Sequence, residues 1–77
     1  MTVKEASRKL YETIALPSFP DWLTSTAVDE KNNKLYIYVK SKKIARHALK
    51  NVIKDEQYEG YPVEIKKMVI SPLGGHG

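Results

Sequence analysis

The chain has 77 residues, of which 42% are apolar and 29% charged, and it contains no cysteine. These values exclude a chain of several domains, a disulfide-stapled scaffold and a site built on thiolate ligands. No apolar run approaches the roughly 18 residues that a membrane-spanning helix needs, so no membrane partner is expected. The N-terminus lacks the apolar core of a signal peptide, and we therefore expect a cytoplasmic location.

The net charge of +4 is unevenly distributed along the chain. Residues 34–54 contain seven basic side chains and no acidic one, whereas the rest of the chain carries six basic and nine acidic side chains. This asymmetry favours an anionic partner, although a lysine-rich helix that serves only solubility has the same composition.

The first predicted element is a helix that begins at Val3 and ends before Pro17. Thr2 and Glu5 have the spacing of a capping box, in which each side chain accepts a hydrogen bond from the other residue's backbone N–H. The helix ends there because the residue before a proline avoids helical backbone angles. Four apolar residues at three- or four-residue spacing form the stripe that should face the core: Val3, Ala6, Leu10 and Ile14.

A proline-stiffened connector follows, in which Phe19 and Trp22 are expected to plug the end of the core. Residues 23–40 then predict a β-hairpin. Its turn, at residues 30–33, ends in two asparagines, which tolerate positive φ. Its second strand, at residues 34–40, alternates without a break, and Leu35, Ile37 and Val39 share one face. The opposite face carries Lys34, Tyr36, Tyr38 and Lys40.

Ser41 is expected to cap a second helix over residues 42–54, and a third strand is predicted at residues 61–70. Between them, residues 55–60 are predicted to form an acidic loop that ends in glycine. The predicted apolar face of the helix consists of Ile44, Ala45, Ala48, Leu49, Val52 and Ile53. Its polar face consists of Lys43, Arg46, His47, Lys50 and Lys54.

The predicted order is αββαβ, which belongs to the α+β fold class. Both helices must bury an apolar stripe, and the simplest solution is a two-layer sandwich with both helices on one face of a three-stranded sheet. The opposite face of the sheet is then open. We expect a single domain over residues 1–70 and a flexible C-terminal tail over residues 71–77.

Three short strings within this frame are VDE at residues 28–30, LYIYVK at 35–40 and EGYPVEI at 59–65. Together they resemble the small module that precedes the protease domain in some bacterial trypsin-like proteins. The resemblance covers about residues 5–70 and implies no catalytic residue, because the chain ends where such a protease begins. The αββαβ order is also similar to that of the BON domain, a non-catalytic binding module, whose glycine-rich second strand is absent here.

No group of residues typical of an active site is found, so we expect neither an enzyme nor a cofactor, a metal ion or a small-molecule substrate. None of the four glycines lies between a strand and a helix, where a phosphate-binding loop would need it. His47 and His76 lack partners at metal-ligand spacing. The carboxylates of Asp55, Glu56 and Glu59 fit a solvated loop better than acid–base catalysis.

Two binding functions remain, and the preferred one is a small interaction or assembly module. A sheet with an open face and free edges can bind a protein partner or a second copy. Tyrosine is enriched at the centre of protein interfaces, which makes Tyr36 and Tyr38 the central contacts and Lys34 and Lys40 their neighbours. A chain of this size also suits an accessory protein of a phage or mobile element.

The alternative is a module that binds single-stranded nucleic acid. Exposed tyrosines between lysines can stack on bases, so Tyr36 and Tyr38 would form the platform. The second helix would add phosphate contacts from Lys43, Arg46, Lys50 and Lys54. If that helix covers the apolar face of the sheet, however, its charges and the tyrosines lie on opposite sides of the domain.

Overall fold

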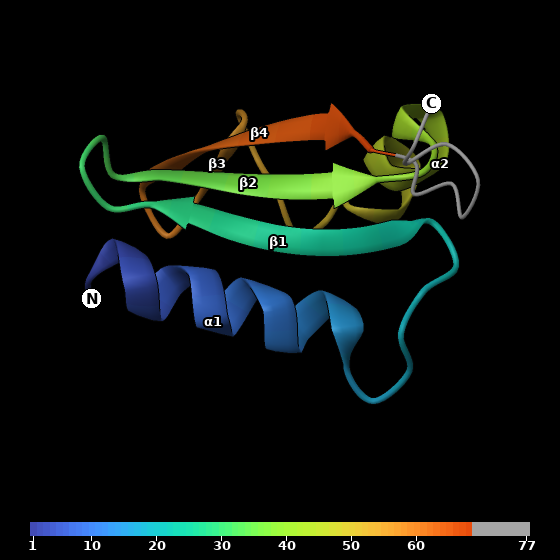
Figure 1. The fold of residues 1–77 in the computed structure, drawn as a ribbon, viewed down its shortest axis with the longest axis horizontal. Helices are drawn as coiled ribbons and strands as arrows, with labels where there is room; N and C mark the ends of the chain where they lie inside the picture. The colour runs from blue at the N-terminus through green and yellow to red at the C-terminus, as the bar shows by residue number, and fades with distance from the viewer. Residues whose placement is uncertain (69–77) are drawn as a thin grey trace, which may run out of the picture.

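A computed structural model describes residues 1–68 of the chain, and residues 69–77 are drawn only as a grey trace (Figure 1). The elements are two helices and four strands: α1 (Val3–Ala15), β1 (Leu23–Asp29), β2 (Lys34–Val39), α2 (Lys42–Ala48), β3 (Gln57–Tyr58) and β4 (Tyr61–Lys67). The strands form an open mixed sheet in the order β1-β2-β4-β3. The α+β class is therefore confirmed, and the predicted number of strands, three, is corrected to four.

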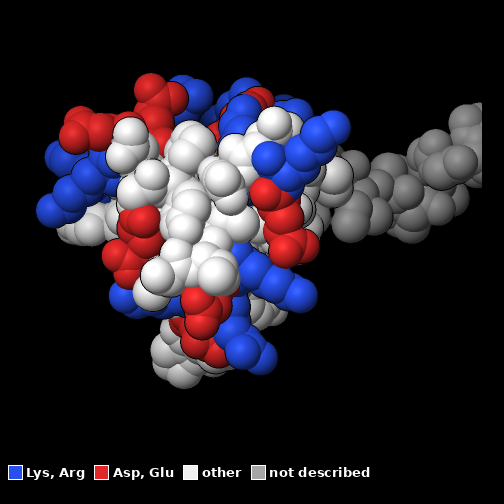
Figure 2. Space-filling view, turned by 90° about the vertical axis from the view of Figure 1, so that its left-hand side faces the viewer, with Lys and Arg blue, Asp and Glu red and all other residues white. Residues whose placement is uncertain are grey.

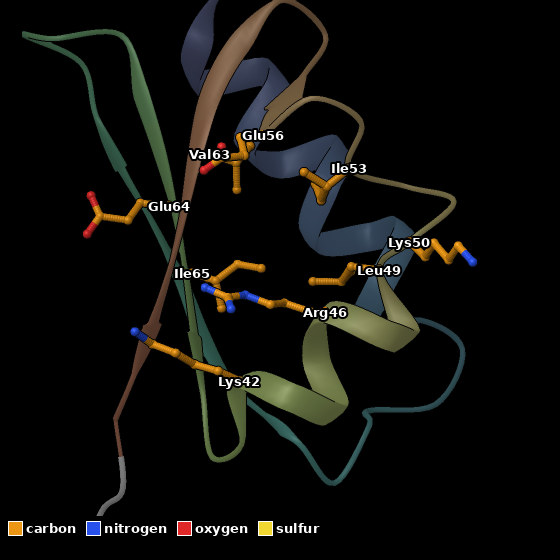
Figure 3. A pocket seen from close by; sticks show the side chains of 9 residues that line it. All are labelled: Lys42, Arg46, Leu49, Lys50, Ile53, Glu56, Val63, Glu64 and Ile65. Carbon is orange, nitrogen blue, oxygen red and sulfur yellow. The ribbon is translucent and has the colours of Figure 1, made fainter.

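Both helices lie on one side of the sheet, which gives the molecule two layers. In Figure 1, α1 runs along β1, and α2 lies at the end of the sheet where β2 stops. In Figure 3, the two helices lie on the same side of β4. The core between the layers is apolar, and its largest fully buried side chains are Leu10, Leu23, Leu35, Ile37, Val39 and Leu49.

Helix α1 begins and ends where the sequence predicts. The hydroxyl of Thr2 accepts from the Glu5 backbone N–H at 3.1 Å, and the Glu5 carboxylate accepts from the Thr2 N–H at 2.8 Å. This reciprocal capping box satisfies two donors that the first turn leaves free. The four residues of the predicted apolar stripe are all buried.

The predicted hairpin is also confirmed, because β1 and β2 pair antiparallel from Asp29 with Lys34 to Leu23 with Val39. In its turn, the Asp29 carboxylate accepts hydrogen bonds from the backbone N–H and the side-chain amide of Asn32. Asn33 has the positive φ, 51°, that the turn requires. The connector before the hairpin differs from the prediction, because Trp22 packs on the core while Phe19 is 50% exposed.

The prediction of a long second helix is wrong, because α2 ends at Ala48 and turns follow it. Two helical turns present only a narrow stripe to the sheet, and Ala45 and Leu49, four residues apart, occupy it. Ile44 points about 100° away from Ala45 and is 55% exposed. Ala48, also assigned to the apolar face, is exposed.

The predicted loop at residues 55–60 contains β3 between two tight turns. Lys54 and Gln57 exchange backbone hydrogen bonds around Asp55 and Glu56, whose φ values are 55° and 57°. Tyr58 then pairs with Tyr61 around residues 59–60, whose φ values are 52° and 84°. Positive φ at both central residues is the requirement of a type I′ turn, which joins antiparallel strands.

Strand β4 pairs parallel with β2 and ends at Lys67, whereas residues 69–70 of the predicted strand and the tail at 71–77 lie outside the described residues. Among residues 1–68, no helix is long and apolar enough to cross a bilayer.

Candidate functional site

The two tyrosines of β2 lie at the centre of the sheet face that the helices leave open. In the strand register, Tyr36 lies between Ala27 of β1 and Glu64 of β4, and Tyr38 lies between Ser25 and Lys66. Because cross-strand partners share a face, these side chains form one continuous surface. We call it the tyrosine face, and it comprises Ser25, Ala27, Lys34, Tyr36, Tyr38, Glu64 and Lys66.

The tyrosine rings stack on each other. Their centroids are 6.2 Å apart, and their planes differ by 17°. Two lysines lie against the Tyr36 ring: the Nζ of Lys34 is 5.3 Å from its centroid and the Nζ of Lys66 is 5.0 Å away. Both separations fall within the range of a cation–π contact. The tyrosines are half-buried by these neighbours, which restricts their rotamers before any partner binds.

Glu64 links the two lysines of this surface. The Nζ of Lys34 donates to its Oε1 at 2.6 Å, and the Nζ of Lys66 lies 3.8 Å from its Oε2. The hydrogen bond from Lys34 lowers the pKa of Glu64 below its ordinary value, and the same bond raises the pKa of Lys34. The centre of the tyrosine face therefore carries paired charges at neutral pH.

The structure brings together three of the four residues predicted as partner contacts. Tyr36, Tyr38 and Lys34 adjoin one another, whereas Lys40 follows the end of β2 and is exposed. Its backbone N–H donates to the Trp22 carbonyl at 2.8 Å, which fixes the chain at that point. Sequence reasoning did not assign Glu64 and Lys66 to this site. Their alternation with Val63 and Ile65 was visible, but the parallel register with β2 was not.

The basic residues predicted to form one helix face are dispersed. Lys43 and Arg46 lie in α2, while Lys50 and Lys54 follow its end. Arg46 and Lys50, together with Lys42, line a hollow of about 550 Å³ between α2 and β4 (Figure 3). Lys54 instead pairs with Gln57 at the start of the first tight turn. The four residues therefore do not lie on one helix.

The hollow and the tyrosine face adjoin each other across β4. In Figure 3, Glu64 points to the open side of the sheet, and Lys42 extends from α2 towards the same strand. The positive charge of Lys42 adds to the lowering of the Glu64 pKa, after the larger effect of Lys34. The charges of α2 and the tyrosines are thus less separated than the sequence predicted.

Charges of both signs also alternate on the end of the molecule that carries the N-terminus and the β1–β2 turn. Figure 2 shows basic and acidic side chains interspersed there around an uncharged area. A surface of mixed sign does not create the field that attracts a polyanion.

Within residues 1–68, no group of three or more histidine, cysteine, aspartate or glutamate side chains could hold a metal ion. His47 is exposed in α2, and His76 lies outside the described residues. Comparison of the chain with protein-family models, with curated proteins and with solved structures gave no match. The resemblances to the protease-preceding module and to the BON domain stay predictions.

Proposed function

We propose that this protein is a non-enzymatic interaction module whose tyrosine face packs against a protein partner or a second copy of the chain. One observation carries the proposal: two stacked tyrosines occupy the centre of an open sheet face. Tyrosine offers a large contact area with few rotatable bonds, so a pair that is already ordered loses little entropy on binding. A small basic module without cysteine is proposed to act in the cytoplasm.

The neighbours of the tyrosines favour a protein over a nucleic acid. Ser25 and Ala27 are small, so β1 leaves the rings accessible from that side. Glu64 lies beside Tyr36 and pairs with Lys34, which leaves less positive charge there to attract a phosphate. Paired lysine and glutamate charges instead suit the polar surround of a protein interface.

Single-stranded nucleic acid remains the second candidate because one observation supports it. Lys42 and Arg46 line the hollow on the other side of β4, within reach of a strand that crossed from the rings to α2. In that arrangement the bases would stack on Tyr36 and Tyr38, and the phosphates would contact the basic residues.

The proposal is tested with the double variant Tyr36→Ser/Tyr38→Ser. The matched control is Tyr11→Ser, which removes an exposed tyrosine from α1. Wild type and both variants are first cross-linked in solution to detect self-association. Each protein is then used as bait in a cell lysate, and the captured proteins are quantified by mass spectrometry. We expect a self-cross-link or one dominant partner that the control retains and the double variant loses while its circular dichroism stays native. Equal recovery by all three proteins would contradict the proposal.

A further inference from the structure

The outer edge of β4 is a second surface, which shares Lys66 with the tyrosine face. Among residues 1–68, part of this edge has backbone hydrogen-bonding groups without a partner. Strand β3 pairs with only Tyr61 and Pro62 of β4. The N–H of Val63 then donates to the Glu56 carbonyl at 2.8 Å. Beyond that bond, no strand of residues 1–68 lies on this side of β4, because the chain turns away at residues 55–56.

The direction of the other backbone N–H and C=O groups of β4 follows from their alternation along the strand. The N–H of Val63 points away from β2, whereas the N–H of Met68 donates to the Val39 carbonyl in β2 at 2.8 Å. Backbone groups of successive strand residues point to opposite sides, so those of Ile65 and Lys67 point outward like those of Val63. Ile65 and Lys67 therefore offer two N–H donors and two carbonyl acceptors to an added strand.

The hollow beside this edge has an apolar floor. Leu49 and Ile53 point from the segment that contains α2 towards Val63 and Ile65 of β4 (Figure 3). On an added strand, the residue opposite Ile65 would place its side chain in this hollow, because cross-strand partners share a face. An apolar side chain fits that position.

Positive charge predominates beside the hollow. Its lining includes three basic side chains, Lys42, Arg46 and Lys50, and two carboxylates, Glu56 and Glu64. Lys66 and Lys67 follow Ile65 along β4. Among residues 1–68, no carboxylate oxygen lies within 4 Å of the side-chain nitrogens of Lys42, Arg46 or Lys67. Within the same described residues, Lys66 has one carboxylate within 4 Å, that of Glu64 at 3.8 Å, and Lys34 holds this carboxylate more closely. A carboxylate next to the apolar residue would complement these charges.

We propose that the outer edge of β4 binds an extended acidic segment of another protein by strand addition, with an apolar side chain in the hollow and carboxylates beside Lys66 and Lys67. Residues 69–77 contain no acidic residue, and the acidic residues at 55–59 belong to tight turns, so neither stretch fits this description. Strand addition gives the partner's segment backbone hydrogen bonds as well as charge contacts.

The probe is the peptide acetyl-Thr-Glu-Glu-Ile-Thr-amide, titrated into the ¹⁵N-labelled full chain and followed by NMR; it ends before Val63, whose outward N–H is already bonded to Glu56. Placed antiparallel to β4, it sets its isoleucine opposite Ile65 and its glutamates opposite Lys66 and Lys67. We expect saturable binding with a Kd of about 1 mM or tighter. The largest amide shifts should occur at Ile65 and Lys67.

Two altered peptides separate the contributions. N-methylation of the peptide's isoleucine removes the donor that faces Ile65, and replacement of both glutamates by lysine reverses the charge. Each change should weaken binding by about tenfold, which corresponds to about 1.4 kcal/mol. Equal binding of the lysine peptide, or no amide shift along β4 up to millimolar peptide, would overturn the proposal.

Protein variants give the matched test. Lys67→Pro removes both the charge and an outward N–H, whereas Lys67→Ala removes the charge alone. The proline should not disturb the fold, because proline is tolerated where a strand's N–H faces outward. We expect Lys67→Pro to bind about fivefold more weakly than Lys67→Ala. Equal affinities of these two variants, with both native by NMR, would contradict strand addition.

A second pair of variants tests the charges, and a third variant separates this site from the tyrosine face. Arg46→Glu should weaken peptide binding, whereas Arg8→Glu, an equivalent change in α1, should not. The variant Tyr36→Ser/Tyr38→Ser should keep the peptide-induced amide shifts at Ile65 and Lys67, because the backbone groups of the edge do not use the rings, although Lys66 loses its contact with Tyr36. If a single-stranded oligonucleotide shifts the same amides and displaces the peptide, the hollow is a nucleic-acid site and the proposal is wrong.

Discussion

The ring of Tyr36 lies against that of Tyr38, with centroids 6.2 Å apart and planes 17° from parallel. Residues two apart in a strand share a face, so β2 alone brings the two rings together. The charged groups around them come instead from the pairing of β2 with β4, which places Glu64 beside Tyr36 and Lys66 beside Tyr38. The site thus combines a local feature of one strand with a contact between distant segments.

The ring contact should be measurable as a coupling free energy. We expect the double-mutant cycle of Tyr36→Ala and Tyr38→Ala to give a favourable coupling of about 0.5 to 1.5 kcal/mol, the range of aromatic pairs. Urea unfolding of the four proteins measures it. The control is the same cycle between Tyr36 and the distant, exposed Tyr11, which should give no coupling. A coupling free energy near zero between Tyr36 and Tyr38 would show that the rings do not stack in solution.

Glu64 should make stability depend on pH in the acid range. Its folded-state pKa is lowered below 4.5 by the hydrogen bond from Lys34, so the stabilisation is present above about pH 4.5 and is lost as the pH falls through the folded-state value. Glu64→Gln should therefore be less stable than wild type at pH 7, and the difference should be smaller at pH 3.

Urea unfolding at both pH values measures this difference. The matched control is Glu12→Gln, because Glu12 is exposed in α1 and has no ion pair among residues 1–68. Its free energy of unfolding should equal that of wild type at both pH values. A Glu64→Gln difference that is equal at pH 7 and pH 3 would contradict the ion pair.

The elements that the sequence predicts well are those whose signal is local. The unbroken alternation of residues 34–40 defines β2, and the capping box with Pro17 defines both ends of α1. The tyrosine face follows from the same alternation, because β2 lies in the middle of the sheet with one apolar side.

The features that the sequence does not reveal depend on contacts between distant segments or on unusual turns. Glu64 and Lys66 reach the tyrosines only through the parallel register of β4 with β2. Strand β3 has two residues and lies between turns in which Asp55, Glu56 and Glu59 adopt positive φ. Aspartate tolerates this conformation, but glutamate rarely adopts it, so the sequence does not signal these turns. The end of α2 is hidden because apolar residues continue at helical spacing as far as Ile53.

Substitutions in α2 should distinguish its observed orientation from the predicted apolar face. Ile44 is 55% exposed and Leu49 is 2% exposed. We expect Ile44→Lys to change the free energy of unfolding by less than about 0.5 kcal/mol. Leu49→Ala should lower it by about 2 to 5 kcal/mol. Chemical denaturation measures both, and a large loss with Ile44→Lys would place that side chain in the core.

The first tight turn should be improved by glycine. Glu56 has a φ of 57°, which disfavours a residue with a Cβ and suits glycine. We expect Glu56→Gly to raise the free energy of unfolding by about 0.5 to 1 kcal/mol. The control is Glu12→Gly in α1, which should lower it by about 1 kcal/mol. A loss of stability in both variants would show that Glu56 does not adopt this conformation.

The central claim is that the tyrosine face binds protein and not nucleic acid. Light scattering tests it most directly, because it measures the solution mass at low and high salt, with and without a mixed-sequence single-stranded oligonucleotide. Our account predicts that the oligonucleotide does not change the mass, whether the protein is a monomer or a dimer. A dimer should persist at high salt, and it should be lost in Tyr36→Ser/Tyr38→Ser. A monomer that gains mass with the oligonucleotide at low salt and loses it at high salt would contradict the account.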